Sequence, residues 1–211
     1  IILYALNDLV EGGHISNVPV YLDSPLASRL LPIYATSHDL FNENARAQIN
    51  KGDDIFSFPK LKIVQSSLES EIIEKTVDPK IIIAGSGMSV GGRIPAHEIN
   101  LLPNPKTTLL ITGYQSVGTV GRALEEGAKH IRIHGQPVEV RAKVVGIGGF
   151  SAHKDSEALI SFVETGRETL EQIFVVHGEP KASLFLIQRI KDYLGLKVLA
   201  PEKTKVYEVD F

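Results

Sequence analysis

The chain has 211 residues, 43% hydrophobic and 22% charged, as expected for one large or two small globular domains. The net charge of −3 excludes a chain that is basic overall, although a local basic groove could still bind nucleic acid. Without cysteines there are no disulfides or thiolate metal sites, so any metal must be bound by histidines and carboxylates. No apolar run approaches the roughly 18 residues of a membrane span, and no secretion signal is evident, so we expect a cytoplasmic protein without membrane contact.

The first ten residues have the apolar spacing of a helix, but no capping residue precedes them. The chain also does not begin with methionine, since its only methionine is Met88. This pattern is typical of a helix that is cut in its middle, and so of a piece of a longer protein. The loss of a tag or of a few residues is the alternative, and the residues alone leave both open.

Strand-like apolar runs alternate with helical patterns in the first part of the chain. Strands are predicted at residues 18–22, 61–65, 81–84 and 107–112. Helices are predicted at residues 27–37, 67–76, 94–101 and 117–126, and a polar loop at residues 50–59. Since strand, loop and helix follow one another repeatedly, the pattern predicts an α/β fold with a parallel sheet and helices on both faces.

The pattern changes after residue 127. Short strands with tight turns are predicted at residues 130–134, 138–141 and 143–147, more typical of an antiparallel set. Helices at residues 155–165 and 181–194 and strands at residues 172–176, 197–199 and 205–209 complete the chain. We therefore expect a domain boundary near residue 127.

A glycine-rich loop, Gly-Ser-Gly-Met-Ser-Val-Gly-Gly-Arg at residues 85–93, follows the clearest buried strand. Ligands bind at the carboxyl ends of strands in open α/β sheets, and glycines let main-chain N–H groups approach an anion closely. The spacing matches neither the Walker loop nor the dinucleotide fingerprint. The loop predicts contact with a phosphate or nucleotide, and a simple turn between strand and helix is the alternative.

A second loop, at residues 113–122, follows the next strand, so the two loops should line one crevice. Arg93 and Arg122 stand near the starts of the two following helices. Either could bind a phosphate bidentately, but a solvated surface arginine is the more common case. Asp23, at the end of the first predicted strand, is expected to cap the next helix rather than face the crevice.

Two histidines, His153 and His177, each follow a predicted strand, and Asp155 is a good N-cap for the helix after the first of them. A neutral imidazole can bind zinc, and a charged one can donate a proton or hold a phosphate. Each alone is more often structural, but their matching positions favour a shared site. The remaining histidines are expected to be structural or at the surface: His14, His38, His97, His130 and His134. His97 and Glu98 lie inside a predicted helix and are expected on a solvated or boundary face.

The chain contains no His-x-His-x-Asp-His cluster. A site with two metal ions usually needs five or more protein ligands, so two histidines are too few. The residues alone therefore predict that any metal site here is incomplete.

Four segments together resemble the β-CASP branch of the metallo-β-lactamase family. They are residues 19–27 (Pro-Val-Tyr-Leu-Asp-Ser-Pro-Leu-Ala), residues 85–93, residues 113–124, and the pair Phe-Ser-Ala-His-Lys-Asp at 150–155 with Val-His-Gly-Glu at 176–179. They span nearly the whole chain in the expected order. The nearest likeness is to bacterial and archaeal ribonucleases related to the cleavage subunit of the polyadenylation machinery.

The resemblance implies a Rossmann-like parallel-sheet β-CASP domain at residues 1–127, truncated at its N-terminus. It is followed at residues 128–211 by the C-terminal part of the metallo-β-lactamase αβ sheet. In such enzymes the upstream portion carries the His-x-His-x-Asp-His ligands and an acidic residue that pairs with the first motif histidine. Both would lie outside this chain.

By motif, His153 resembles the histidine that contacts the scissile phosphate and can act as general acid, and His177 resembles a histidine that binds one zinc. Ser151 is implied to hydrogen-bond a phosphate. The RNA backbone is expected on the main-chain N–H groups of the loop at Gly85, Ser86, Gly87, Met88, Ser89 and Gly91. The intact enzyme would hydrolyse phosphodiester bonds with a hydroxide held by two zinc ions.

The resemblance thus implies a fragment of a zinc-dependent RNA-processing nuclease, itself inactive and binding zinc only partly or not at all. Its expected partners are single-stranded RNA, the missing N-terminal metallo-β-lactamase portion and, because an unpaired sheet edge promotes association, a second copy in a homodimer. One alternative is an α/β module that binds phosphates or nucleotides without catalysis. Another is hydrolysis of DNA or of a small ester.

Overall fold

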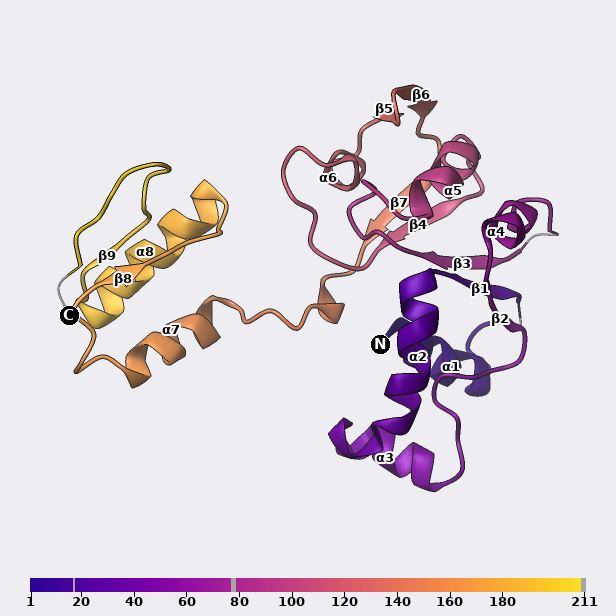
Figure 1. Ribbon diagram of the computed structural model, residues 1–211, viewed down its shortest axis with the longest axis horizontal. Helices are drawn as coiled ribbons and strands as arrows, with labels where there is room; N and C mark the ends of the chain where they lie inside the picture. Colours follow the sequence, from indigo (N-terminus) through magenta and orange to yellow (C-terminus); the bar gives the residue numbers. More distant parts are fainter. Residues whose placement is uncertain (17, 77–78, 210–211) are drawn as a thin grey trace. The chain divides into compact units, whose positions relative to one another are not determined.

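The computed structural model describes residues 1–16, 18–76 and 79–209 and divides the chain into two compact units, Ile1–Ser151 and Ala152–Phe211. Both units combine helices with parallel strand pairs, as Figure 1 shows. This confirms the predicted α/β fold. The boundary between family domains near residue 127 stays a prediction.

Three parallel strands form the first sheet of the larger unit: β1 (Val20–Asp23), β2 (Leu61–Ile63) and β3 (Ile81–Ala84). Their order is β2-β1-β3, with Val20 opposite both Leu61 and Ile81. The central strand β1 pairs with a strand on each edge, and all four of its residues are buried, so it is covered on both faces. The sheet therefore fixes the position of Asp23 at the end of β1.

The helices around this sheet are α1 (Ile2–Glu11), α2 (Pro25–Thr36), α3 (Glu43–Asn50) and α4 (Ser67–Ile73), with a 3₁₀ turn η1 (His38–Leu40). The Ser24 hydroxyl caps α2 by accepting a hydrogen bond from the N–H of Ala27 at 3.3 Å. The expectation that Asp23 caps this helix was therefore wrong. The helix α3, which the sequence did not predict, begins with a capping bond from the Ala45 N–H to Asn42 at 2.9 Å.

The rest of the larger unit holds α5 (Ile94–Leu101), β4 (Thr108–Ile111), α6 (Val120–Glu125), β5 (His130–Ile133), β6 (Gln136–Glu139), β7 (Lys143–Gly146) and η2 (Gly148–Phe150). β5 and β6 form an antiparallel hairpin. β7 instead pairs in parallel with β4. The antiparallel set expected after residue 127 is thus confirmed for the hairpin and wrong for β7, because the chain returns to the earlier strand rather than continuing the hairpin.

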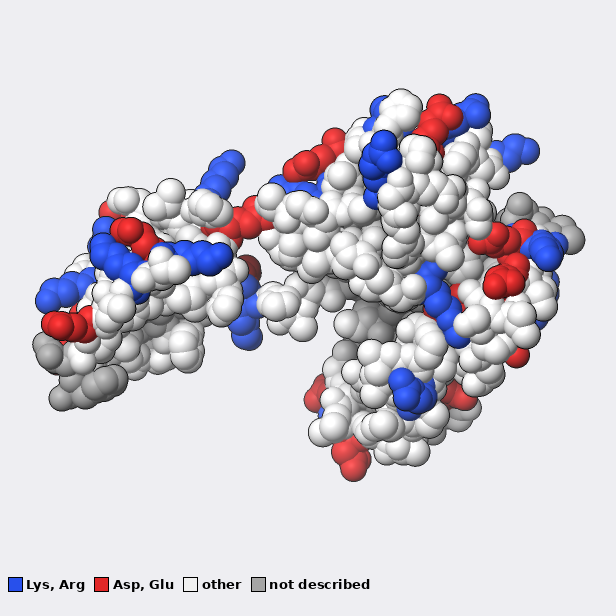
Figure 2. All heavy atoms as spheres, turned by 45° about the horizontal axis from the view of Figure 1, so that its top comes forward, with Lys and Arg blue, Asp and Glu red and all other residues white. Residues whose placement is uncertain are grey.

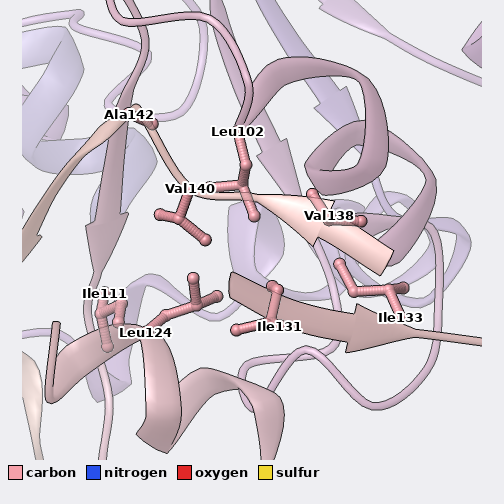
Figure 3. Close-up of a cluster of buried hydrophobic side chains, with 8 residues drawn as sticks. All are labelled: Leu102, Ile111, Leu124, Ile131, Ile133, Val138, Val140 and Ala142. Carbon is pink, nitrogen blue, oxygen red and sulfur yellow. The ribbon is translucent and has the colours of Figure 1, made fainter. Parts of the chain in front are cut away.

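Eight buried apolar residues form the core of this region, and Figure 3 shows their side chains pointing toward one another from α6, the hairpin and the adjoining segments. They are Leu102, Ile111, Leu124, Ile131, Ile133, Val138, Val140 and Ala142. Burial of each large side chain contributes about 1.5–3 kcal/mol to folding. The core therefore anchors the segment between β4 and β7, including the loop that precedes α6.

The smaller unit contains α7 (Ser156–Thr165), β8 (Ile173–Phe174), α8 (Pro180–Leu194) and β9 (Val198–Leu199), and its two strands are parallel. Ile160 from α7 packs with Ile187, Ile190 and Leu194 from α8 and with Val198. The strand predicted at residues 205–209 is not formed. In the described part of the chain, none of the helices is long and apolar enough to cross a membrane.

Charged side chains of both signs are interspersed over each unit on the face shown in Figure 2. On that face neither unit carries basic side chains without acidic ones among them, in keeping with the net charge of −3. This face therefore offers an anion no broad positive field.

Candidate functional site

The glycine loop joins β3 to α5 and is closed by its own main-chain hydrogen bonds. The carbonyl of Gly85 accepts from the N–H groups of Arg93 and Ile94, both at 2.9 Å, and the N–H of Ser86 donates to the Gly91 carbonyl at 3.1 Å. Gly92 has a φ of 69°, and a Cβ there would lie 2.7 Å from the carbonyl carbon of Gly85. Only glycine fits this position without moving the loop.

The second loop, between β4 and α6, lies directly against the first. The side-chain amide of Gln115 donates to the carbonyls of Gly87 at 2.7 Å and Gly113 at 3.0 Å, and the N–H of Gly121 donates to the Met88 carbonyl at 3.1 Å. Gln115 is 1% exposed, so this link is shielded from water. The two loops are thus in contact, and the prediction that they line one crevice stays a prediction.

Several N–H groups of the glycine loop are available to a ligand. Among residues 1–16, 18–76 and 79–209, none accepts a hydrogen bond from the N–H groups of Gly87, Met88, Val90 or Gly91. Gly87 and Val90 are also exposed. Because unpaired N–H groups carry partial positive charge, a loop of this kind favours an anion such as a phosphate.

A buried polar cluster lies beneath the loop and centres on Asp23. This carboxylate is 0% exposed, and it accepts hydrogen bonds from the Ser70 hydroxyl at 2.5 Å and from the Arg93 guanidinium. Its Oδ2 also lies 2.7 Å from Nε2 of His97. Burial alone would raise the pKa of Asp23, but the hydrogen bonds from these three side chains outweigh it and leave the pKa below its ordinary value.

A second buried carboxylate holds the loop from the helix α5. The Ser89 hydroxyl donates to Glu98 Oε1 at 2.6 Å, and Ser89 itself has a φ of 58°. Burial raises the pKa of Glu98, and the bond from Ser89 only partly opposes this. His97 and Glu98 are each 3% exposed, so the expectation of a solvated or boundary face was wrong. The polar side of α5 faces the loop and β1, and sequence pattern cannot distinguish such a face from a solvated one.

The signal for this cluster is partly visible in the sequence. Arg93 and His97 are four residues apart at the start of α5, so their side chains lie on the same side. That spacing could have suggested a common partner. It could not have identified Asp23, which is 70 residues away from Arg93 in the chain.

The glycine loop belongs to the larger unit, and His153 and His177 both belong to the smaller unit. Both histidines are exposed, and Asp155 caps α7 as predicted, accepting from the Ala158 N–H at 2.9 Å. His177 has a φ of 62°, an uncommon conformation for a residue other than glycine, which occurs more often at functional sites than elsewhere. Ser151 is exposed at the end of the larger unit. The roles expected for Ser151, His153 and His177 stay predictions.

Zinc sites in enzymes have at least three protein ligands. Within the described ranges, no three His, Cys, Asp or Glu side chains are grouped in a way that could hold a metal ion. The described residues therefore form no group that fits a zinc site by itself, and the role of His177 as one zinc ligand stays a prediction.

Parallel strands that end in two joined loops, one of them with N–H groups open to a ligand, define an α/β domain with a candidate ligand site at the carboxyl end of a strand. Residues 1–124 match the Beta-Casp domain, and residues 137–201 match the Zn-dependent metallo-hydrolase RNA specificity domain. The chain therefore belongs to the β-CASP family of metallo-β-lactamase-fold nucleases.

Relatives of this chain include a named ribonuclease and a named termination factor. Ribonuclease TTHA0252 of Thermus thermophilus is 33% identical over 185 residues, covering 88% of this chain and 42% of that protein. Transcription termination factor FttA of Thermococcus kodakarensis is 34% identical over 206 residues, covering 95% of this chain and 32% of that protein. An RNase J-like protein of Methanocaldococcus jannaschii is 32% identical over 208 residues, covering 99% and 47%. The chain thus spans less than half the length of these relatives.

Proposed function

We propose that this chain is the β-CASP and C-terminal portion of an RNA-processing nuclease that hydrolyses phosphodiester bonds, and that its glycine loop binds the RNA backbone. The observation that carries the proposal is the closed loop at the end of β3 with N–H groups free for an anion. A relative named a ribonuclease and a match to an RNA specificity domain support RNA as the ligand.

The proposal assigns one task to each group. The N–H groups of Gly87, Met88, Val90 and Gly91 bind phosphate oxygens, whereas those of Ser86 and Ser89 are hydrogen-bonded within the loop. Ser151 adds a hydroxyl donor. His153, when protonated, donates a proton to the leaving oxygen, as a histidine that acts as general acid does. His177 is one ligand of a zinc site in the whole protein, which acts in the cytoplasm.

We further propose that the 211-residue chain by itself does not hydrolyse RNA. The reason is the ligand count, since the sequence has no His-x-His-x-Asp-His cluster and no cysteine. The test is cleavage of a labelled single-stranded RNA by the purified chain, with and without added zinc. Strong zinc-dependent cleavage that disappears in His177→Ala would contradict this part of the proposal.

RNA binding by the loop is tested with Gly87→Val. A Cβ at Gly87 would meet nothing within 4 Å and the residue is exposed, so we expect the variant to fold normally while blocking a ligand on the loop. The matched control is Gly146→Val on β7, where a Cβ would be 3.5 Å from its nearest neighbour, an oxygen of Glu125. Fluorescence anisotropy with a labelled single-stranded RNA should show at least about tenfold weaker binding for Gly87→Val alone, since base-independent phosphate contacts carry most of the affinity.

A phosphate- or nucleotide-binding module without catalysis is the second candidate, and the same free N–H groups favour it. A competition experiment, in which unlabelled nucleotides displace bound RNA, distinguishes the binding module from the nuclease portion. A mononucleotide that displaces the RNA oligonucleotide at equal concentration would favour the module. Displacement only by longer RNA would favour the nuclease portion, because successive phosphates then contribute to binding.

A further inference from the structure

Arg93 occupies the junction between the glycine loop and α5. Its N–H closes the loop on Gly85 at 2.9 Å, and its side chain donates through Nη1 to Oδ1 of Asp23. The Arg93 side chain is 17% exposed, whereas that of Asp23 is 0% exposed. One side of the guanidinium is thus fixed in the interior while part of the side chain stays open to solvent.

The Arg93 guanidinium has donors to spare. Its five N–H groups form a planar fork that suits phosphate oxygens. In the parts of the chain that the structure describes, Nη1 bonds to Asp23, and Nε and Nη2 have no partner. An anion at the adjoining loop could accept hydrogen bonds from these remaining donors.

Asp23 is itself immobilised from three directions. It ends β1, which is paired with strands on both edges, and its Oδ2 is engaged by Ser70 of α4 at 2.5 Å and His97 of α5 at 2.7 Å. Only Oδ1 faces Arg93. A carboxylate held in this way fixes the direction of the guanidinium before any ligand arrives, which reduces the ordering required on binding.

We propose that Arg93 contacts a phosphate of the RNA bound at the glycine loop, and that Asp23 is the positioning residue that aims it. This inference rests on the proposed RNA binding by the loop. The ligand chemistry is a phosphate anion, either a phosphodiester within the strand or a phosphate at its 5′ end.

The experiment measures RNA affinity of the 211-residue chain against salt concentration for Arg93→Ala, Arg93→Lys and a control, Arg132→Lys. Arg132 is an exposed residue of the β5–β6 hairpin and donates to the Gly135 carbonyl. Arg93→Ala should bind about tenfold more weakly, and its slope of log affinity against log salt should be smaller by about 1, as expected for one lost phosphate contact. Arg93→Lys should recover part of the loss, and Arg132→Lys should match the unaltered chain.

The role of Asp23 needs a measurement that loss of stability alone would not change. Asp23→Asn should weaken binding several-fold, but the double variant Asp23→Asn/Arg93→Ala should bind no more weakly than Arg93→Ala, because Asp23 acts through Arg93. If Asp23→Asn does not fold, Ser70→Ala removes one bond to the same carboxylate and takes its place. Fully additive losses would contradict positioning.

Two further readouts locate the contact. Addition of inorganic phosphate should shift one arginine Nε–H signal in the NMR spectrum, and that signal should be missing in Arg93→Lys. Oligonucleotides with and without a 5′ phosphate then identify which phosphate is bound. Unaltered affinity of Arg93→Ala, with binding lost in Gly87→Val, would overturn this inference and leave the proposed function standing. Unaltered affinity in both variants would overturn both.

Discussion

Replacement of Gly92 by alanine tests whether the shape of the glycine loop depends on its main-chain geometry. The φ of 69° at Gly92 lies in the left-handed region, which costs a residue with a Cβ about 1–2 kcal/mol. The added Cβ would also lie 2.7 Å from the carbonyl carbon of Gly85, whereas ordinary contacts begin near 3.4 Å. The Gly85 carbonyl must therefore move.

That movement would loosen the hydrogen bonds from the N–H groups of Arg93 and Ile94, each contributing about 0.5–1.5 kcal/mol. The φ penalty adds to this loss. Alanine also lowers the conformational entropy of the unfolded chain, which offsets about 0.4–1 kcal/mol. Gly92→Ala should therefore destabilise the larger unit by about 2–4 kcal/mol. For a unit of this size the midpoint of thermal unfolding should fall by about 4–16 °C.

The matched control is the neighbouring Gly91→Ala, whose Cβ would meet nothing within 4 Å and whose φ is not in the left-handed region. Calorimetry should show Gly91→Ala within about 2 °C of the unaltered chain. Hydrogen exchange at the Arg93 and Ile94 amides should accelerate only in Gly92→Ala. Equal unfolding temperatures and equal exchange in the two variants would refute the steric reasoning.

Three other predictions concern the buried groups. Because the pKa of Glu98 is raised, the folded state favours the neutral form of this side chain. The free energy of unfolding should therefore fall as pH rises from about 4.3 through the raised pKa. Urea titrations at pH 4–8 should show this decline in the unaltered chain and not in Glu98→Gln. Because the pKa of Asp23 is lowered, its contribution is present above about pH 3.9 and is lost in more acid solution; an acid limb unchanged in Asp23→Asn would argue against it. Leu124 is 0% exposed, so Leu124→Ala should cost about 2–5 kcal/mol in chemical denaturation, and a cost below 1 kcal/mol would mean that the core is not packed as described.

The strands and helices near the glycine loop could be predicted because their signals are local. The run Ile-Ile-Ile-Ala became β3 (Ile81–Ala84), and α5 (Ile94–Leu101) begins where the apolar pattern resumes. Ser66 caps α4 as its sequence suggests. The pairing of β7 with β4 was missed because strand partners are set by packing at a distance, which short apolar runs do not encode.

The candidate site, like the fold, could be predicted from the sequence only where its signals are local. The glycine loop and its neighbour were predicted from turn chemistry, and the structure joins them through Gln115. The ion pair of Asp23 with Arg93 and the burial of Glu98 were not predicted, since a charged residue in a polar pattern is usually solvated. Burial of such residues depends on which elements meet, and those elements lie far apart in the chain.

The bonds that converge on Asp23 also bear on how the larger unit opens. They tie β1 to α4, to α5 and to the end of the glycine loop, so detachment of any one of these segments removes a hydrogen bond from the buried Asp23 carboxylate. The hydrogen-bonded amides of Arg93 and Ile94 should therefore exchange mainly through cooperative unfolding of the sheet, whereas the open amides of Gly87 and Val90 should exchange fast. A ligand that grips the loop would accordingly stabilise elements it never touches, and protection should spread along β1 as readily as along the loop itself.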